Sequence, residues 1–331
     1  SLKLNLLPKN IFQVDNEDLL ETYLFNERLP NPIGLAAGFD KSAEVYNSLF
    51  KLGYGFVEVG TVTPKRQLGN PKPRIFRLER DQALINRLGF NNHGSEIVSK
   101  RISDNLPSGF LGINVGPNKD TKKKEEDYYL CLYKLATNAG YLTINISSPN
   151  TEGLRDFHDQ NELEKLLIGI NKIRGEKNIL KPIALKLSPD INNEDISRII
   201  ELIIKYKIDG IVVSNTTDSN RENLSDSQKN EKGGLSGQPI KNLSTNLIKK
   251  FFKDTKGKIQ IIGVGGVDSG KTAFEKITAG ANAVQLYTGM VYKGPGIVRN
   301  IKKELISIIK KENLKNIRDA IGINAWPLRS L

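Results

Sequence analysis

The sequence predicts an α/β fold, specifically a (β/α)8 TIM barrel with a short N-terminal extension and an inserted hairpin. Eight short apolar segments rich in Val and Ile alternate with segments whose apolar residues recur at helical spacing. Near-continuous apolar strands are typical of parallel sheets buried on both faces. A length of 331 residues is common for one such barrel. We expect residues 1–30 to form a connector and hairpin, and residues 31–331 to form the catalytic barrel.

The expected strands recur along the chain with a helix after each one. The strands span residues 33–37, 56–62, 111–115, 141–146, 183–187, 210–214, 259–264 and 283–287. The helices span residues 44–52, a stretch ending near 105, and residues 125–138, 162–174, 194–206, 243–252, 271–279 and 298–310. Within 194–206, Ile196, Ile199, Ile200 and Ile203 repeat at i, i+3, i+4 and i+7, which is the spacing of one buried helix face.

Two segments depart from this alternation. Residues 20–29 are expected to form a small hairpin ahead of the barrel. Residues 63–92 are rich in Pro, Arg and Gly, and we expect them to be an insertion at one face of the barrel. Within that insertion, residues 74–78 and 83–86 are expected to pair as a hairpin.

Composition and charge limit the classes of function. The net charge of +12 suits an anionic ligand or anionic lipid, although most lysine runs are read as solvated faces. No basic stripe interleaved with aromatic residues stands out, so we expect no nucleic-acid partner. The only cysteine, Cys131, is expected to be a small buried hydrophobe on a helix. The two histidines, His93 and His158, are expected to be structural or exposed, and no metal site is predicted. No apolar stretch is long enough to span a bilayer.

Polar or small residues follow the expected strands, at the end where active sites of such barrels form. They are residues 37–41, 60–61, 114, 145, 186, 214–216, 265–266 and 287–289. Any one of them alone could simply mark the end of a strand, but so many at matching positions predict one shared site. The glycines at 265–266 and the segment 287–289 occupy the usual phosphate corner of such barrels. A monophosphate fits better than a dinucleotide, because no G-x-G-x-x-G turn is followed by an acidic residue.

The segment 143–150 (TINISSPN) places a hydroxyl between amides. Pro149 keeps Ser148 out of the α region, so its hydroxyl is a candidate base or nucleophile. The amides of Asn86, Asn145, Asn150 and Asn215 would suit a planar ligand with donor and acceptor edges, such as a pyrimidine.

Lys186 lies within the apolar strand 183–187, where a charge is costly unless it is paired. It fits a Schiff-base lysine, a counter-charge to an anionic cofactor, or an interior lysine paired with a carboxylate. The residues by themselves leave these alternatives open.

Together these segments resemble the dihydroorotate dehydrogenases, in particular the quinone-dependent, membrane-associated class 2 branch. The most specific matches are residues 34–41 (GLAAGFDK), 58–64 (EVGTVTP), 86–91 (NRLGFN), 145–151 (NISSPNT), 214–216 (SNT), 233–237 (GGLSG) and 263–266 (GVGG). The resemblance implies a barrel that binds FMN, oxidises dihydroorotate to orotate and passes the electrons to a quinone, in pyrimidine (UMP) biosynthesis. Class 1 enzymes carry cysteine at the position of Ser148 and class 2 enzymes carry serine, so it also implies that Ser148 is the base.

Site residues follow from the resemblance, motif by motif. The implied FMN contacts are Ala37, Gly38, Lys41, Thr61, Asn114, Asn145, Lys186, Ser214, Gly237, Gly265, Gly266, Tyr287 and Thr288. The implied substrate contacts are Lys41, Asn86, Arg87, Leu88, Gly89, Phe90, Asn145, Asn150, Asn215 and Thr216. We expect Ser148 to take the C5 proton while hydride leaves C6, with the hydroxyl of Thr151 as the proton exit. We expect Lys186 to stabilise negative charge on the reduced flavin.

The chain departs from the family pattern in three places. Glu152 stands where the family usually has a small residue or proline, and Ser214 stands where many members have threonine. Class 2 members carry two helices before the barrel that bind the membrane and form the quinone tunnel, and only residues 1–12 would be a remnant here. We expect peripheral membrane association through a segment at or upstream of the N-terminus. The membrane would be a bacterial inner membrane, at its cytoplasmic face, or the mitochondrial inner membrane.

Other functions remain open at this point. A flavin-dependent tRNA dihydrouridine synthase would use the positive charge, but it relies on a loop cysteine, and Cys131 lies on an expected helix. A Schiff-base aldolase would use Lys186, and borohydride trapping would detect it. A non-enzymatic carrier or scaffold is disfavoured, because buried amides without a ligand are destabilising.

Overall fold

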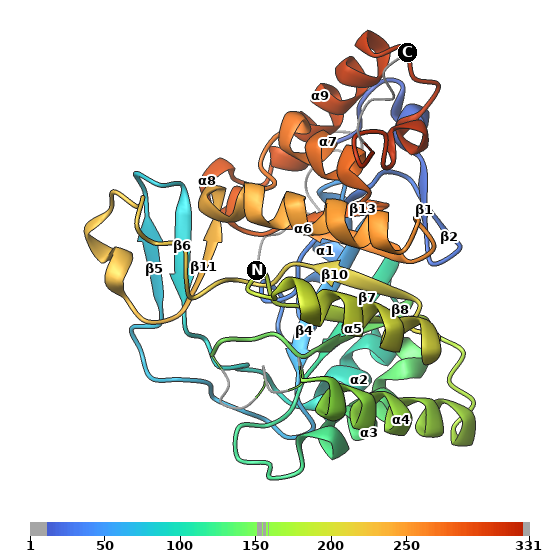
Figure 1. The fold of residues 1–331 in the computed structure, drawn as a ribbon, viewed down its shortest axis with the longest axis vertical. Helices are drawn as coiled ribbons and strands as arrows, with labels where there is room; N and C mark the ends of the chain where they lie inside the picture. The colour runs from blue at the N-terminus through green and yellow to red at the C-terminus, as the bar shows by residue number, and fades with distance from the viewer. Residues whose placement is uncertain (1–11, 151–153, 155–156, 158, 327–331) are drawn as a thin grey trace.

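Eight parallel strands close into a barrel in the order β10-β12-β13-β3-β4-β7-β8-β9 (Figure 1). The computed structural model describes residues 12–150, 154, 157 and 159–326. The barrel strands are β3 (Ile33–Leu35), β4 (Phe56–Val62), β7 (Phe110–Val115), β8 (Tyr141–Asn145), β9 (Ile183–Leu187), β10 (Gly210–Val213), β12 (Gln260–Val264) and β13 (Ala283–Leu286). The predicted (β/α)8 fold is confirmed, and several strands end one or two residues earlier than expected.

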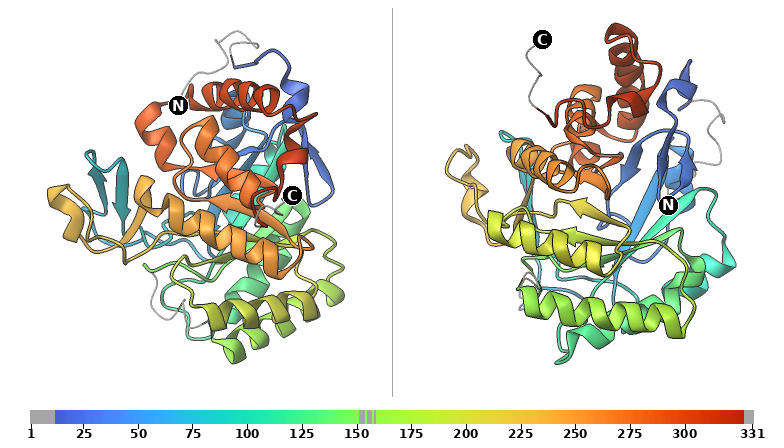
Figure 2. Two further views of the ribbon diagram at one scale, coloured as in Figure 1. Left: turned by 45° about the horizontal axis from the view of Figure 1, so that its top comes forward. Right: turned by 45° about the vertical axis from the view of Figure 1, so that its right-hand side comes forward.

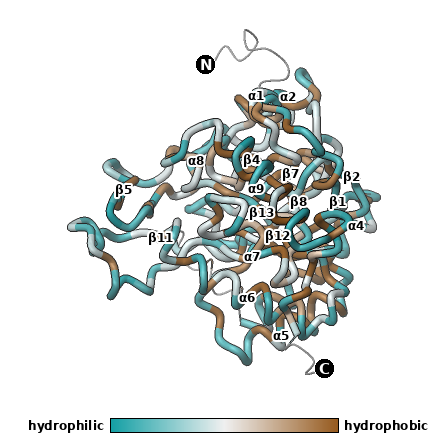
Figure 3. Tube along the Cα trace, turned by 90° about the horizontal axis from the view of Figure 1, so that it is seen from above, coloured by the Kyte–Doolittle hydropathy of each residue, from teal (hydrophilic) through white to brown (hydrophobic). Residues whose placement is uncertain are grey.

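Helices cover the outside of the barrel in both views of Figure 2. They are α1 (Tyr46–Lys51), α2 (Ser95–Asp104), α3 (Lys124–Leu135), α4 (Gln160–Glu176), α5 (Asn193–Lys205), α6 (Lys241–Asp254), α7 (Gly270–Ala279), α8 (Thr288–Lys293) and α9 (Ile297–Lys311). The short helix α8 was not expected. On α5, Ile196, Ile199 and Ile203 are buried as the helical spacing predicts. The outward-facing strand residues and the inner helix faces form one large apolar core, seen as the brown region of the tube in Figure 3.

A hairpin closes the amino-terminal end of the barrel. Strands β1 (Thr22–Leu24) and β2 (Glu27–Leu29) pair antiparallel, so the hairpin expected within residues 20–29 is confirmed. Leu24 and Leu29 are fully buried in a cluster with Phe56 and Tyr141, which project into the barrel. The bottom of the barrel is therefore filled with apolar side chains, and polar groups are left to the opposite end.

The insertion between β4 and α2 corrects part of the prediction. Strands β5 (Ile75–Leu78) and β6 (Ala83–Asn86) form the expected hairpin. A third strand, β11 (Gly234–Gly237), pairs antiparallel with β6, so the unit is a three-stranded sheet rather than a hairpin. A short glycine-rich stretch has no alternating apolar pattern, and only its pairing with β6 makes it a strand. Figure 1 shows this sheet and the β1–β2 hairpin at opposite ends of the barrel.

Membrane-spanning helices and metal-ligand clusters are both absent from the described residues. No helix there is both long and apolar enough to cross a membrane. In the same part of the chain, no group of three or more His, Cys, Asp and Glu side chains is placed to hold a metal ion.

Candidate active site

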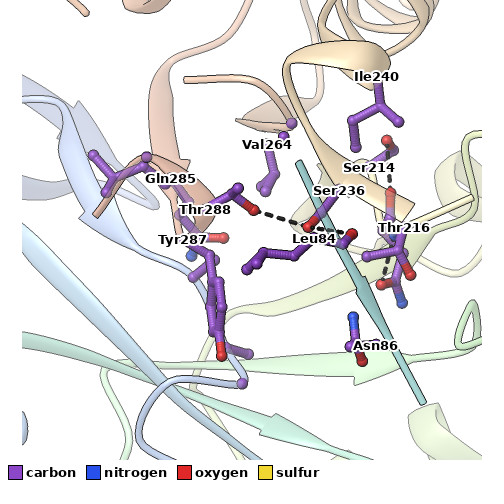
Figure 4. A pocket seen from close by; sticks show the side chains of 18 of the residues that line it. Leu84, Asn86, Ser214, Thr216, Ser236, Ile240, Val264, Gln285, Tyr287 and Thr288 are labelled. Atoms are coloured by element: carbon purple, nitrogen blue, oxygen red, sulfur yellow. Dashed lines mark hydrogen bonds between the residues drawn. The ribbon is translucent and has the colours of Figure 1, made fainter. Parts of the chain in front are cut away.

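A cavity opens at the carboxyl ends of the barrel strands, under the β5–β6–β11 sheet. The loops that follow six barrel strands supply most of its lining, and Leu84, Asn86 and Ser236 supply one side from the sheet. Figure 4 shows these groups converging from several elements. In that view the hydroxyls of Ser236 and Thr288 share a hydrogen bond of 2.8 Å, which ties the sheet to the start of α8.

Most of the residues predicted from the sequence line this cavity. From the predicted cofactor set, they are Ala37, Gly38, Lys41, Thr61, Asn145, Lys186, Ser214, Gly237, Gly265, Gly266, Tyr287 and Thr288. From the predicted substrate and catalytic sets, they are Asn86, Leu88, Gly89, Phe90, Ser148, Asn150, Asn215 and Thr216. Asn114 and Arg87 do not line the cavity, and Thr151 lies outside the described residues, as do Glu152 and His158.

Asn114 lies beneath the cavity and hydrogen-bonds to residues that line it. It is fully buried, and its Oδ1 accepts a hydrogen bond of 2.7 Å from Thr61 Oγ1. Its Nδ2 donates to Glu58 Oε1 at 2.9 Å, while Asn145 Nδ2 donates to Thr61 Oγ1 at 3.1 Å. Because each amide orientation is fixed by the next partner, Asn114 sets the position of Asn145 at the cavity surface.

Arg87 points away from the cavity. Its Nη1 donates to Glu231 Oε2 at 2.8 Å and to the carbonyl of Lys232 at 2.9 Å. Its guanidinium also stacks over the ring of Phe76, 4.5 Å from the ring centroid. These contacts fasten the end of β6 to the segment before β11, so Arg87 has a structural role in this arrangement.

Ser148 lies in the turn after β8, with 5% of its surface exposed. Its Oγ accepts a hydrogen bond of 3.2 Å from the backbone N–H of Asn150. The neighbouring amide of Asn215 is held by Ser147 Oγ at 2.9 Å and by Asn145 Oδ1 at 3.3 Å. The hydroxyl and two amides are therefore held in place before any ligand arrives.

Two lysines bring positive charge to the cavity. Burial lowers the pKa of Lys186, and the negative charge of Glu58 acts in the opposite direction. Burial, together with the positive charges of Arg74 and Lys186, lowers the pKa of Lys41 to about 8. Neither ammonium group hydrogen-bonds to any other described residue. The pair favours an anionic ligand, because an anion would offset both the burial and the mutual repulsion.

The sequence reasoning gave no role to Glu58 and Gln285, which complete the barrel interior. Glu58 is fully buried and accepts hydrogen bonds from Asn114, from Tyr141 Oη at 2.7 Å and from Gln285 Nε2 at 2.9 Å. Gln285 lines the cavity, and its buried Oε1 has no partner among the described residues. A charge within an apolar strand, the signal that singled out Lys186, also marks Glu58.

Cys131 and His93 lie outside the cavity lining. Cys131 is fully buried in α3, as expected, and burial raises the pKa of its thiol. His93 makes two polar contacts outside the lining of this cavity. Its backbone N–H donates to Ser42 Oγ, and its Nδ1 lies 3.4 Å from Arg101 Nη1. Cys131 therefore contributes to the packing of the helical layer, whereas His93 lines a second hollow that adjoins the cavity.

Known proteins with similar sequences and folds share one description. The family model for dihydroorotate dehydrogenase matches residues 19–309. The chain is 48% identical over 297 residues to dihydroorotate dehydrogenase (quinone) of Bartonella tribocorum, covering 88% of this chain and 82% of that one. It is 43% identical to the mitochondrial dihydroorotate dehydrogenase (quinone) of Mus musculus, covering 98% of this chain and 84% of that one.

Solved structures agree with this. DHODH of Eimeria tenella in complex with ferulenol superimposes with a TM-score of 0.91 at 38% identity, covering 97% of this chain and 92% of that one. The ligand-free form of the same protein gives a TM-score of 0.90 at 39% identity, covering 97% and 95%. This chain belongs to the dihydroorotate dehydrogenase family, and within it to the quinone-dependent class 2 branch.

Proposed function

We propose that this chain oxidises dihydroorotate to orotate in pyrimidine biosynthesis, with FMN as hydride acceptor and a quinone as final electron acceptor. Family membership supports the reaction, since the relatives are named dihydroorotate dehydrogenase (quinone). In this structure, the observation that carries the proposal is the cavity itself: two ammonium groups with no hydrogen-bond partner among the described residues line it together with amides held in fixed orientations.

The residues of the cavity fit FMN. The buried Oε1 of Gln285 has no hydrogen-bond partner in the described part of the chain, and it could accept a hydrogen bond from an N–H group of a flavin ring. Lys186 supplies a positive charge for the same ring. Gly265 and Gly266 directly follow β12, whose Val264 pairs with Gln285 of the neighbouring strand β13, and both have positive φ, 116° and 73°. Because they are glycines, no side chain stands between their backbone and a phosphate group. The hydroxyls of Ser236 and Thr288 lie beside them in the lining.

When bound, FMN supplies a hydride acceptor whose reduced form carries additional negative charge. Lys186 would stabilise that charge from a site that is already desolvated, so little reorganisation is needed as the charge develops. Burial lowers the pKa of Lys186, and the nearby carboxylate of Glu58 favours the charged form and so opposes part of that effect. Glu58 itself is held by three neutral donors rather than by the lysine, so the ammonium stays directed at the cavity.

Ser148 would remove the proton from C5 of dihydroorotate. A serine hydroxyl is a weak base, and the N–H of Asn150 that donates to its Oγ would stabilise negative charge there as the proton is passed on. Asn86, Asn145 and Asn215 would hold the pyrimidine ring, and the positional advantage of such fixed amides is a large part of catalysis. We keep Thr151 as the proposed proton exit.

The quinone would approach through a second hollow that adjoins the first. Gly38, Lys41, Ile75, Leu88 and Tyr287 line both cavities. The outer hollow also carries exposed apolar side chains, namely Phe39, Val45 and Leu68. These exposed apolar side chains, set among polar ones, support access of a hydrophobic electron acceptor.

We also propose that residues 31–331 act as the catalytic unit and residues 1–30 as an extension. Peripheral membrane association would place the outer hollow near the lipid, through a segment at or upstream of the N-terminus. A bacterial inner membrane or the mitochondrial inner membrane is the proposed location, and one relative at 43% identity is a mitochondrial enzyme.

The test uses the purified full chain. It should be yellow, dihydroorotate should bleach the flavin absorbance without oxygen, and a quinone should restore it. Dihydrouracil, which lacks the carboxylate, is the matched control and should leave the flavin oxidised. A colourless protein that binds no added FMN would refute the proposal.

A further inference from the structure

Lys276 is a fully buried lysine that the proposed reaction does not use. It lies in α7, and its Nζ donates to Ser244 Oγ at 3.1 Å, to Thr245 Oγ1 at 3.0 Å and to the carbonyl of Lys241 at 3.4 Å. All three acceptors are uncharged and belong to the start of α6. A buried ammonium bonded only to neutral groups is costly, so a negative charge is expected close to it when the protein works.

The acceptors of Lys276 pack directly against the glycines of the proposed phosphate corner. A Cβ built on Gly265 would lie 3.1 Å from Ser244 Cβ, and one built on Gly266 would lie 2.5 Å from Lys241 Cβ. Ser244 Oγ also donates to the carbonyl of Val264. The start of α6 is therefore fixed to the glycine segment.

The stem of Lys276 crosses the back of the same segment. A Cβ built on Gly263 would lie 3.3 Å from Lys276 Cδ. Gly265 and Gly266 lie two and three residues after Gly263, and they line the cavity on the side of the backbone away from Lys276. Figure 1 shows α6 and α7 next to each other beside β13, and the two helices are in contact. The ammonium thus lies behind the glycine backbone, one layer from the cavity.

We propose that Lys276 is a positioning residue for the phosphate group of FMN, stabilising its negative charge from behind the glycine backbone without touching it. This inference rests on the proposed binding of FMN with its phosphate at Gly265 and Gly266. Among the residues that the structure describes, no carboxylate hydrogen-bonds to Lys276.

The charged groups near Lys276 have other partners. Glu275, on the same helix, pairs with Lys241 Nζ of α6 at 3.4 Å. On α9, Glu304 accepts from the backbone N–H of Gly270 at the other end of α7. The second buried lysine of that helix layer, Lys302, pairs with Glu17.

The interaction has a predictable dependence on pH. Burial lowers the pKa of Lys276 to about 7, with Glu275 opposing this and Lys241 adding to it. A phosphate dianion on the cavity side of the glycines would raise that pKa, because it favours the charged lysine. Between the two pKa values, FMN binding takes up a proton at Lys276, so affinity for FMN falls as the pH rises above about 7.

Riboflavin separates this effect from those of Lys41 and Lys186. Both lysines respond to the flavin ring, which riboflavin shares, whereas only FMN carries the phosphate. The experiment compares FMN and riboflavin binding to the full chain freed of flavin, in wild type, Lys276→Met and Lys250→Met. Lys250 lies on α6 in an exposed pair with Asp254, so it is a matched control for the loss of one positive charge.

We expect Lys276→Met to weaken FMN binding about 10-fold and to change riboflavin binding less than about twofold. Lys250→Met should change neither. An equal loss for both ligands would mean that Lys276 only packs the helices, and no loss for FMN would also overturn the inference.

A measurement on the wild-type chain keeps the inference testable if Lys276→Met does not fold. Calorimetric titration in two buffers of different ionisation heat gives the protons taken up on binding. At about pH 8, where the phosphate is already a dianion, FMN should take up more protons than riboflavin. Equal uptake would overturn the inference. If the wild type binds no flavin at all, the proposed function fails instead, so the two failures are distinguishable.

Discussion

At the residue scale, Ser148 is the side chain on which proton removal depends. Ser148→Ala should slow reduction of bound flavin by dihydroorotate by roughly two orders of magnitude or more, because the general base is lost. Ser148→Cys should keep part of the rate, since a thiolate is a competent base. Stopped-flow absorbance under anaerobic conditions measures both. Near-normal reduction in the alanine variant would remove Ser148 from the mechanism.

Lys186 contributes charge rather than proton transfer. Lys186→Met keeps the length of the stem and removes the ammonium, so negative charge on reduced flavin loses its stabilisation. The two-electron potential of the bound flavin should fall by about 30 mV or more, which corresponds to about 1.4 kcal/mol. Equilibration with redox dyes measures this separately from turnover. An unchanged potential would leave Lys186 with a packing role, and retention of dihydroorotate by borohydride in wild type would indicate Schiff-base chemistry.

The lowered pKa of Lys41 leads to a prediction of how the affinity for orotate varies with pH. Burial lowers the pKa of Lys41 to about 8, with Arg74 and Lys186 adding to the effect, and a bound carboxylate would raise it again. A group whose pKa rises on binding strengthens binding when the pH is below its pKa in the free protein. That contribution is lost as the pH rises above the pKa in the free protein. Orotate binding should therefore weaken above about pH 8. Lys41→Met should bind orotate more weakly at pH 7 and lose this part of the pH dependence, as flavin spectral titrations would record.

At the element scale, a partly buried ion pair joins α9 to the N-terminal region. Lys302 Nζ lies 2.6 Å from Glu17 Oε1, with the lysine side chain 1% exposed and the carboxylate side chain 26% exposed. Glu17 begins a short 3-10 helix, Glu17–Leu20, that leads into the β1–β2 hairpin. The pair therefore fastens the hairpin that closes the barrel to the last long helix.

Removing either partner should have unequal effects. Glu17→Gln leaves a buried lysine without its counter-charge, so it should lower the free energy of unfolding by up to about 3 kcal/mol. Lys302→Met removes the buried charge itself and should cost less. Urea denaturation measures both, with Glu126→Gln, in an exposed pair with Lys123, as the control that changes little. A larger loss for Lys302→Met would contradict this account.

Elements differ in how well their own sequence specifies them. Strands β4 and β9 have the expected bounds, because a predominantly apolar run, even with one charged residue in it, specifies a doubly buried strand locally. Helix α5 followed its isoleucine spacing in the same way. Strand β11 could not be predicted, since Gly234 to Gly237 become a strand only through hydrogen bonds to β6, far away in the sequence. Local patterns predict an element that is stabilised by any apolar surface it packs against. They do not predict an element that forms only by hydrogen bonding to one particular distant strand.

At the scale of the whole molecule, the cavity joins loops from around the entire barrel. A ligand that binds only the folded chain stabilises it by mass action, by about 2.7 kcal/mol at a concentration one hundred times its Kd. Added FMN should therefore raise the melting temperature of the flavin-free chain, and Lys276→Met should reduce that rise for FMN but not for riboflavin. Differential scanning fluorimetry or calorimetry measures this. An unchanged melting temperature at saturating FMN would contradict binding across the barrel.

The sequence by itself determined the barrel, the order of its strands and helices, and most of the residues at the cavity. The barrel follows from strand and helix periodicity, which is a local property, and the shared site follows because all eight carboxyl ends of a closed parallel barrel meet at one rim. Lys186 and the glycines at 265–266 were found in this way. Most of the individual cofactor and substrate contacts followed from the resemblance of the motifs to the dihydroorotate dehydrogenases.

Only the tertiary structure decided which of those residues face the cavity and what lies behind them. It turned Arg87 towards Glu231, placed Asn114 below Asn145, and brought Lys276 behind the glycine segment. Side-chain direction, burial and charge pairing arise from contacts between elements that are distant in the chain, and no local pattern records them.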